Sequence, residues 1–394
     1  MNVVVQGLWH LGSVTAACLA SIGHHVTGID PDPSIIARLR AGQAPLYEPG
    51  LDELVQHGLR DHTLRFTDDT HAALAGADVL WVAFDTPVDD DDRADTAWVL
   101  DRVREIVPLL RNGCLVLVSS QLPVGSAGLL ELVVAELRPG ADIDVAVSPE
   151  NLRLGKAIEV FLRPDRIVVG ARSDAARTRI ETLLAPLHRP IEWMRVESAE
   201  MTKHAINAFL ATSVVFANEI AVLCERSGAD AREVERGLKT EARIGPGAYV
   251  GPGASYAGGT LARDIAFLAE AGARHELPMT LFHAVRESND NHKQWMQDTL
   301  RRHVPALAEA TITVLGLAYK PGTDTLRRSS AIELVRWLRT QGAAVRVHDP
   351  RVDVLPGDLQ DGVTVCADAL DAASGSDALV IATAWASFRE LDAG

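Results

Sequence analysis

Apolar runs and a helical pattern alternate over about the first 30 residues of the chain. Val3 to Val5 form a β-branched run, and a glycine-containing turn leads into a helix-like stretch from Val14 to Ile22. After Gly23, the residues His25 to Ile29 form a second strand-like run, which Asp30 closes. A strand, a glycine turn, a helix and a second strand over this length predict a βαβ unit.

The same alternation continues to about residue 197. Helix-like segments such as Ala97–Leu110 separate further strand-like runs, which are Val79–Phe84, Leu115–Ser119, Ile143–Val147 and Ile167–Val169. Strands that alternate with helices in this way predict a doubly wound parallel sheet.

The pattern then changes twice. Residues 198–238 are almost wholly helical in pattern, a glycine-rich passage covers Ile244–Gly259, and helices follow to about His303. The alternation restarts with the strand-like runs Thr311–Leu315, Val345–His348 and Ala378–Ala382 and a helix near Ala331–Gln341. We therefore expect an α/β protein with two Rossmann-like doubly wound parallel-sheet domains, 1–197 and 304–394, joined by a helical central domain, 198–303.

Composition and charge narrow the choice of partners. The 394 residues are 47% hydrophobic and 23% charged, which is ordinary for a globular protein. The formal net charge is −15, aromatic residues make up 5%, and no basic run occurs. Nucleic-acid binding is not expected, because phosphate binding needs clustered lysine and arginine side chains.

The cysteines and the N-terminus indicate the compartment. Cys18, Cys114, Cys224 and Cys366 are isolated and form no Cys-x-x-Cys pair, so we expect no metal site and no disulfide framework. The N-terminus lacks the basic region of a signal peptide, and we find no run of about 18 apolar residues. A cytoplasmic protein without a membrane partner is expected.

The turn after the first strand reads Gly7-Leu8-Trp9-His10-Leu11-Gly12. A dinucleotide-binding turn usually reads G-x-G-x-x-G, and its second glycine, here Trp9, lets the backbone approach the pyrophosphate. About 20 residues on, the Asp30 carboxylate can accept both ribose hydroxyls and would repel a ribose phosphate, which favours NAD over NADP. The structural alternatives are a plain strand-to-helix turn and a helix N-cap at Asp30.

Longer motifs follow in order along essentially the whole chain. They are Ala44–Leu51 (APLYEPGL), Ser148–Arg153 (SPENLR), Phe161–Gly170 (FLRPDRIVVG), Glu200–Phe209 (EMTKHAINAF), Asn218–Ile220 (NEI), Leu315–Pro321 (LGLAYKP) and His348–Pro350 (HDP). Together they resemble the UDP-glucose/GDP-mannose dehydrogenase family. The resemblance implies an NAD-binding N-terminal domain, a helical dimerisation domain that would make a homodimer, and a C-terminal domain that binds the nucleotide sugar.

Members of that family oxidise a primary alcohol of the sugar twice, and a cysteine captures the intermediate aldehyde before the second oxidation. The thiol suits this task because it is partly ionised near neutral pH and strongly nucleophilic. The family's motif Gly-Gly-Ser-Cys-Phe-Pro-Lys-Asp aligns with Ala257–Asp264 (AGGTLARD), which places Thr260 at the cysteine position. A hydroxyl without an adjacent base is a far weaker nucleophile. The structural alternative for Thr260 is a helix N-cap after a glycine turn.

The other catalytic positions of the family are kept. Lys203 and Asn207 are four residues apart, so they share one face of a helix. The resemblance implies that they act with Asp264 on the water and the alkoxide during alcohol oxidation, and that Glu150 serves the aldehyde and thioester stages. A solvated helix lysine, a helix–helix hydrogen bond and a surface charge are the respective alternatives for Lys203, Asn207 and Asp264.

Two further positions depart from the family pattern beside the cofactor. Gln121 replaces a threonine that takes part in catalysis, and Asp85 stands where glycine is usual, next to a retained Thr86. The candidate cofactor-binding residues are therefore Gly7, Trp9, His10, Leu11, Gly12, Asp30, Thr86 and Gln121. His10 is also a candidate acid–base group, with a packing or surface role as the alternative.

The candidate substrate residues come from two segments. The glycine-rich segment and the C-terminal domain supply Tyr249, Gly253, Tyr256, Gly258, Arg263, Lys320 and Arg327. Lysine and arginine suit a diphosphate, and glycines permit backbone N–H contacts with it. Ordinary turn and surface roles are the alternative for each.

Three functions remain open from the sequence. The first is an NAD-dependent dehydrogenase of a nucleotide sugar that stops after one two-electron step, because the thiol is lost. The second is a dehydrogenase that still reaches the uronic acid by slow oxidation of the aldehyde hydrate through Thr260 and Glu150. The third is a nucleotide-sugar-binding protein without catalysis, which the residues at four changed positions would favour: Trp9, Asp85, Gln121 and Thr260.

Overall fold

The computed structural model describes residues 1–394 except 90–93, 151, 258 and 392–394. The chain forms two compact units, Met1–Ala205 and Ile206–Gly394. The fold is α/β with a largely parallel N-terminal sheet, a helical central region and a second parallel sheet, as the sequence predicts. The three-domain division at 197/198 and 303/304 stays a prediction.

The first unit contains a large twisted sheet. Among the described residues, its strand order is β3-β2-β1-β4-β5-β6-β7-β8. The strands are β1 (Asn2–Gln6), β2 (His25–Ile29), β3 (Leu64–Phe66), β4 (Val79–Val82), β5 (Leu115–Val118), β6 (Asp144–Val147), β7 (Ile167–Ala171) and β8 (Ile191–Met194). The helices are α1 (His10–Ser21), α2 (Pro33–Arg40), α3 (Leu51–Arg60), α4 (Thr70–Leu74), α5 (Thr96–Ile106), α6 (Ser126–Leu137), α7 (Ala157–Leu162) and α8 (Asp174–Leu184).

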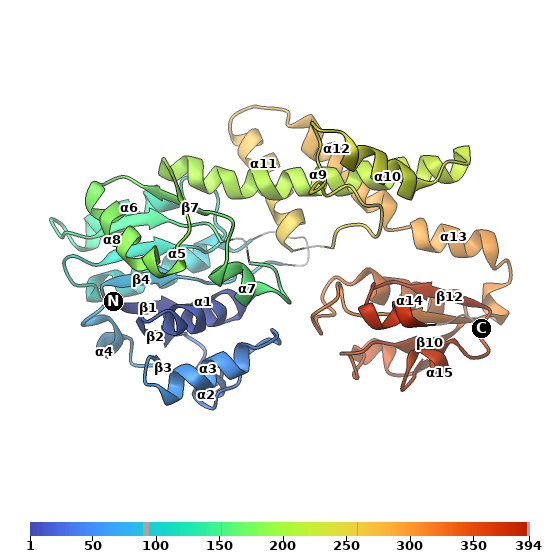
Figure 1. Ribbon diagram of the computed structural model, residues 1–394, viewed down its shortest axis with the longest axis horizontal. Coiled ribbons are helices and arrows are strands. Elements are labelled where there is room, and N and C mark those ends of the chain that lie inside the picture. Colours follow the sequence, from blue (N-terminus) through green and yellow to red (C-terminus); the bar gives the residue numbers. More distant parts are fainter. Residues whose placement is uncertain (90–93, 151, 258, 392–394) are drawn as a thin grey trace. The chain divides into compact units, whose positions relative to one another are not determined.

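Helices cover both faces of this sheet (Figure 1). Val3 and Val5 of β1 pack into one apolar core, whereas Val4 packs into the core on the opposite face. Alternate side chains of a strand point to opposite faces, so a strand buried on both sides needs a continuous apolar run. The sequence of β1 satisfies that requirement, as do β4 and β5, whose residues are all buried.

One strand pairing differs from a wholly parallel sheet. β6 and β7 are antiparallel, with Ala146 opposite Ala171, while β7 and β8 are again parallel. The described part of the connection between β6 and β7 holds the six-residue helix α7, which packs against α1. In an antiparallel pair the second strand starts at the edge of the sheet where the first strand ends, so the chain makes no crossover to the opposite edge between β6 and β7.

The order of the strands reverses between β1 and β4. β1 pairs with β2 on one side and with β4 on the other, both in parallel register. The crevice beyond the carboxyl ends of two such strands is where doubly wound sheets bind their ligands. Residues that follow β1 and β4 are therefore placed to contact a dinucleotide.

The long helix α9 (Val196–Ser227) begins in the first unit and continues into the second. The other central helices are α10 (Ala231–Thr240), α11 (Thr260–Arg274), α12 (Thr280–His292) and α13 (Trp295–His303). Ala211 and Val215 of α9 pack with Ile265 of α11 and Val285 of α12 in one apolar cluster. This cluster fixes α11 against the part of α9 that lies in the second unit.

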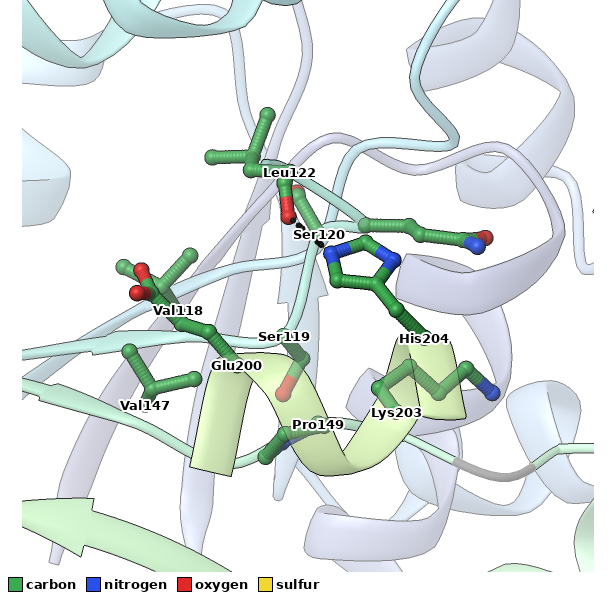
Figure 2. A pocket seen from close by; sticks show the side chains of 10 residues that line it. Val118, Ser119, Ser120, Leu122, Val147, Pro149, Glu200, Lys203 and His204 are labelled. Carbon is green, nitrogen blue, oxygen red and sulfur yellow. Dashed lines mark hydrogen bonds between the residues drawn. The ribbon is translucent and has the colours of Figure 1, made fainter. Parts of the chain in front are cut away.

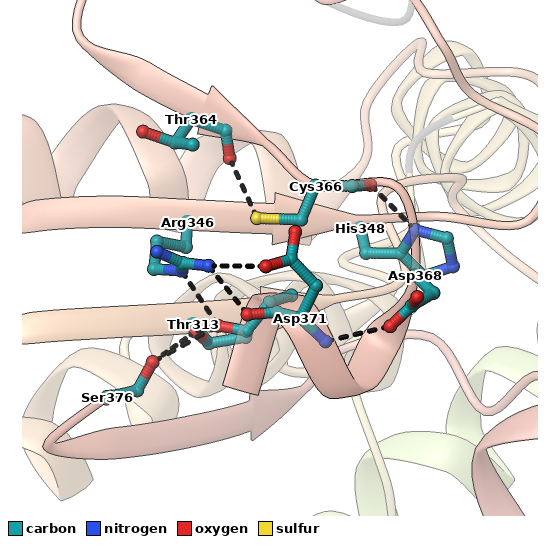
Figure 3. Close-up of polar contacts among 9 residues, drawn as sticks. Thr313, Arg346, His348, Thr364, Cys366, Asp368, Asp371 and Ser376 are labelled. Carbon is teal, nitrogen blue, oxygen red and sulfur yellow. Dashed lines mark hydrogen bonds and ion pairs between the residues drawn. The ribbon is translucent and has the colours of Figure 1, made fainter. Parts of the chain in front are cut away.

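The C-terminal sheet is parallel, with the strand order β11-β10-β9-β12 among the described residues. Its elements are β9 (Thr311–Leu315), α14 (Ser330–Thr340), β10 (Ala344–His348), β11 (Val363–Val365), α15 (Ala369–Ala373) and β12 (Ala378–Ile381). Polar contacts attach α15 to the strands (Figure 3). Arg346 of β10 donates to the backbone oxygens of Asp371 at 2.6 Å and Ala372 at 3.0 Å, and the Thr313 hydroxyl donates to Ala372.

Candidate active site

The glycine turn after β1 has the geometry that a dinucleotide needs. Gly7 has a φ of +88°, and a Cβ on Gly12 would lie 1.6 Å from the Gly7 oxygen, so both positions require glycine. Trp9, at the second glycine position, has a φ of −69°, which any L-residue adopts, and its side chain is 44% exposed. The turn therefore accommodates Trp9 without left-handed backbone, and its close strand–helix packing suits a dinucleotide.

Asp30 closes the other side of this turn. Its Oδ2 accepts the Leu8 N–H at 2.6 Å and its Oδ1 accepts the Asp32 N–H at 2.8 Å. Burial raises the pKa of Asp30, and the hydrogen bonds from Asp32 and Leu8 only partly offset that rise. The alternative role as a helix N-cap is wrong, because the cap of α2 is Asp32, which accepts from Ser34.

A second carboxylate lies at the N-terminus of α1. Asp85 follows β4 by three residues, and its Oδ2 accepts the Leu11 N–H at 3.0 Å. Asp30 and Asp85 thus bond to the backbone on either side of Trp9. In the sequence Asp85 stands out only as a departure from glycine, and nothing there predicts this contact.

His10 joins the turn to the loop that carries Glu150. His10 Nε2 lies 2.9 Å from Glu48 Oε2, and Glu48 also accepts the N–H groups of Gly155 and Ala157 at 2.8 Å each. Burial alone would raise the pKa of Glu48, but the hydrogen bonds from His10 and the two backbone groups outweigh it and hold that pKa below its ordinary value. Glu48 belongs to the APLYEPGL motif, and its role could not be predicted from the sequence.

The ends of β5 and β6 and the start of α9 enclose a small cavity within the first unit (Figure 2). It measures about 20 Å³, which is room for about one water molecule. Lys203 and Gln121 line it, and Lys203 Nζ lies 3.8 Å from Glu150 Oε1. Ser120 is buried, and its hydroxyl has no hydrogen-bond partner among the described residues and is placed to bind such a water.

Hydrogen bonds of three further side chains fix the walls of this cavity. The Thr86 hydroxyl donates to the Gln121 backbone oxygen at 2.8 Å, and His204 Nε2 lies 2.9 Å from the Leu122 oxygen. Glu200 accepts N–H groups at the N-terminus of α6, and burial raises its pKa. Glu200 and His204 belong to the motif that contains Lys203, which is the signal that could have identified them.

The second unit brings three of the candidate catalytic residues together. Asn207 Nδ2 donates to Asp264 Oδ2, and both side chains are buried. Thr260 is the first residue of α11, one helical turn before Asp264, and is exposed. The alternative in which Thr260 is the N-cap is wrong, because Gly259 holds the cap position with a φ of +95°. Lys203 precedes Asn207 by one turn of α9.

The candidate substrate residues of the glycine-rich segment differ in exposure. Tyr249 is exposed, whereas Tyr256 is buried and exchanges backbone hydrogen bonds with the Asn289 side chain. Burial raises the pKa of Tyr256 to about 12. The Gly253 N–H donates to Asn218, and Arg263 lies on α11. Gly258 lies outside the described residues.

The two C-terminal candidates flank one turn. Lys320 lies 5.5 Å from the Tyr319 ring centroid, in the segment after β9. Arg327 is exposed and precedes Ser329, the N-cap of α14. Their position at the carboxyl end of a parallel strand is the usual place for ligand contacts in such sheets.

All four cysteines are buried. Burial raises the pKa of Cys114 to about 11 and raises those of Cys18 and Cys366 as well. Within the residues that the structure describes, no three His, Cys, Asp or Glu side chains gather as metal ligands. Helix α9 is the one described helix that is long and apolar enough to cross a membrane by length and composition, a test that core helices of soluble proteins also pass.

Models of one protein family match three successive segments of the chain. Residues 1–188 match the NAD-binding domain of the UDP-glucose/GDP-mannose dehydrogenase family, residues 197–291 its central domain and residues 313–394 its UDP-binding domain. These matches cover most of the chain and agree with the resemblance that the sequence motifs indicate.

Individual relatives agree. The chain is 37% identical over 403 residues to a UDP-glucose 6-dehydrogenase of Rhizobium meliloti, covering 100% of this chain and 91% of the relative. It is 34% identical to a Bacillus subtilis UDP-glucose 6-dehydrogenase, TuaD, covering 99% of this chain and 85% of the relative.

A solved UDP-glucose dehydrogenase from Pyrobaculum islandicum superposes with a TM-score of 0.92 at 35% identity, covering 99% of this chain and 91% of that one. A UDP-D-ManNAc dehydrogenase from Pyrococcus horikoshii superposes with a TM-score of 0.85 at 29% identity, covering 100% of this chain and 91% of that one. With its glycine turn, its Asp30 and its NAD-binding domain, the chain belongs to the UDP-glucose/GDP-mannose dehydrogenase family, and NAD is its cofactor.

Proposed function

We propose that this protein oxidises the primary alcohol of a UDP-sugar with NAD and stops at the aldehyde after one two-electron step. This proposal rests on the arrangement of two catalytic residues on α9 and two on α11. Lys203 and Asn207 are one helical turn apart, as are Thr260 and Asp264, and the Asn207–Asp264 hydrogen bond joins the two helices. The residues that act in alcohol oxidation are thus kept, whereas Thr260 stands at the position that carries the thiol in the family.

Each retained residue has a chemical task in the first oxidation. The Lys203 ammonium stabilises the negative charge that develops on the alcohol oxygen as its proton leaves. Asp264 accepts that proton directly or through a water molecule, and Asn207 holds the Asp264 carboxylate in place. Bound NAD supplies the acceptor for the hydride that leaves the same carbon. The products are the aldehyde, NADH and one proton.

The second oxidation fails for lack of a nucleophile. In the family that step depends on a thiolate, and Thr260 offers only a hydroxyl with a far higher pKa than a thiol. The four cysteines cannot substitute, because all are buried and burial raises the pKa of Cys18, Cys114 and Cys366. The aldehyde is therefore not captured.

The substrate class follows from the relatives and from the residues kept here. The matched relatives are named UDP-glucose and UDP-D-ManNAc dehydrogenases, so UDP-glucose and UDP-N-acetylmannosamine are the first substrates to test. Lys320, Arg327 and Arg263 supply positive charge suited to the diphosphate. Tyr249, Tyr256 and the glycines at 253 and 258 complete the proposed substrate set.

The decisive experiment counts NADH per molecule of substrate consumed. Purified protein is mixed with NAD and a limiting amount of UDP-glucose, and the product is identified by mass spectrometry after trapping aldehydes with a hydrazine. One NADH and a trapped aldehyde are expected. Two NADH with a carboxylate would instead favour direct oxidation of the aldehyde hydrate through Thr260 and Glu150, and no NADH with either sugar would reject the catalytic proposal.

We also propose a cytoplasmic homodimer whose interface includes α9. Phe209, Phe216 and Leu223 are spaced seven residues apart on this helix and are 72%, 46% and 63% exposed. Residues at this spacing form one stripe, and an exposed apolar stripe of this kind is typical of a protein–protein contact.

A further inference from the structure

The Asp85 carboxylate lies at the end of α1 where the fold binds the pyrophosphate of a dinucleotide. Asp85 Oδ2 accepts the Leu11 N–H at 3.0 Å, and Leu11 is the second residue of α1. The first backbone N–H groups of a helix have no partner within the helix, and together with the helix dipole they attract anions. The phosphates of a Rossmann-bound dinucleotide use these same groups.

Among the described residues, no other acidic side chain bonds to a backbone N–H group in the first turn of α1. The first turn of α1 contains no acidic residue, and its N-cap Trp9 makes no side-chain capping bond. Asp85 is distant in sequence, by 74 residues, and reaches α1 because it follows β4, the strand on the far side of the switch point from β2. The carboxylate therefore reaches the N-terminus of α1 from the end of β4, whereas the glycine turn follows the neighbouring strand β1.

We infer that Asp85 is an internal anion that the pyrophosphate of NAD must displace from the N-terminus of α1, so that this residue limits the affinity for the cofactor. A carboxylate and a phosphate cannot both accept the single Leu11 N–H, and like charges at this distance repel each other. Asp85 is exposed and follows the end of the strand, so its side chain can turn away when the cofactor binds. The inference rests on NAD as the cofactor and not on the reaction proposed above.

Direct binding measurements test this inference without turnover. Calorimetric titrations of the wild-type protein, Asp85→Asn and Asp85→Gly would use three probes: NAD, ADP and adenosine. Asp85→Asn keeps the shape of the side chain but removes its charge, and Asp85→Gly removes the side chain. Asp89→Asn is the matched control, because Asp89 is an exposed carboxylate in the same loop, four residues after Asp85.

The expected pattern depends on the phosphates of the probe. Both Asp85 variants should bind NAD and ADP about tenfold more tightly than the wild type, which is the scale of one charge-assisted hydrogen bond with the helix dipole. Adenosine, which has no phosphate, should bind the variants and the wild type equally, and Asp89→Asn should bind all three probes like the wild type.

Several results would overturn the inference. Equal or weaker NAD binding by a folded Asp85→Asn, checked by circular dichroism, would show that Asp85 does not compete with the pyrophosphate. An equal gain in affinity for adenosine would assign the tighter binding to the adenosine pocket. An equal gain in NAD affinity in Asp89→Asn would assign it to general charge. If the Asp85 variants gain NAD affinity as expected but the protein shows no turnover, the proposed reaction is contradicted and this inference stands.

Discussion

Asp30 and Asp349 make the same hydrogen bond in two different sheets. Asp30 follows β2 and accepts the Leu8 N–H at 2.6 Å, and Asp349 follows β10 and accepts the Leu317 N–H at 2.6 Å. Each donor is the residue after a turn glycine with positive φ, Gly7 or Gly316. The two α/β regions thus repeat one strand–turn device, and in each the carboxylate satisfies a backbone donor that the turn leaves without a partner.

The first prediction concerns the stability of the C-terminal sheet. Asp349 also accepts from the Ala318 N–H, the Trp385 indole and the Arg351 N–H. An amide at this position has only one accepting oxygen, so Asp349→Asn should lower the free energy of unfolding by about 2–3 kcal/mol. Urea denaturation followed by tryptophan fluorescence measures it. The exposed Asp353→Asn is the control, and equal midpoints for the two variants would contradict the assigned role.

The second prediction restores the missing thiol. Thr260 lies at the N-terminus of α11, where the helix dipole lowers the pKa of a cysteine thiol. Thr260→Cys should therefore raise the yield from one NADH toward two per UDP-sugar and shift the product toward the carboxylate. Thr260→Ser, which keeps a hydroxyl, is the control and should stay at one. A single NADH from a folded Thr260→Cys would show that more than the sulfur was lost.

The third prediction tests the oxidation residues. Lys203→Ala should reduce kcat about 10²-fold or more, because it removes the positive charge beside the developing alkoxide. Asn207→Ala should also reduce kcat, by releasing the Asp264 carboxylate. Steady-state NADH production measures both, with NAD affinity determined separately by calorimetry. Lys293, the C-cap of α12, forms an ion pair with Asp290, and Lys293→Ala should match the wild type. An unaffected kcat in Lys203→Ala would exclude the proposed role.

The fourth prediction is a dependence of stability on pH at Glu48. Its pKa is lower in the folded protein than its ordinary value of 4.5, so its ionised form stabilises the fold above that pH and the gain disappears as the pH falls through the lowered pKa. Glu48→Gln should be less stable than the wild type by about 1–3 kcal/mol at pH 7, and the difference should shrink below pH 4.5. Thermal unfolding across this range measures it. The exposed Glu53→Gln should show no comparable change.

The fifth prediction concerns the dimer. Placing charges on the exposed stripe, as in Phe209→Glu with Leu223→Glu, should convert the proposed dimer to a monomer, because two buried carboxylates would face an apolar partner surface. Light scattering after size exclusion reads the mass directly. Leu281→Glu, an exposed apolar residue on α12, is the control. A wild-type monomer at micromolar concentration would contradict the proposal outright.

Local pattern predicts the longer elements well and the shorter ones poorly. The runs at Thr311–Leu315 and His25–Ile29 are strands with those bounds. The three-residue strands β3 and β11 and the half-exposed β8 were not predicted. A strand of three residues carries too little periodicity to be distinguished from a loop, and it forms because a neighbouring strand offers it partners.

The candidate site, too, could be predicted only in part from the sequence. Lys203 and Asn207 share a helix face because of their spacing, which can be read directly from the sequence. The distant partners of Asp30, Asp85 and Glu48 could not be predicted from the sequence, because these bonds join residues that the fold brings together from far apart in the chain. The N–H groups that Glu48 accepts, for instance, come from residues 107 and 109 positions away.

The sequence by itself determined the alternation of strands and helices, the family motifs and the threonine at residue 260, since each is a property of local order and side-chain identity. The tertiary structure alone decided the reversal of β7 and which carboxylate lies at the N-terminus of α1. Those outcomes depend on which strands become neighbours, so only the assembled sheet brings the Asp85 carboxylate to the Leu11 N–H.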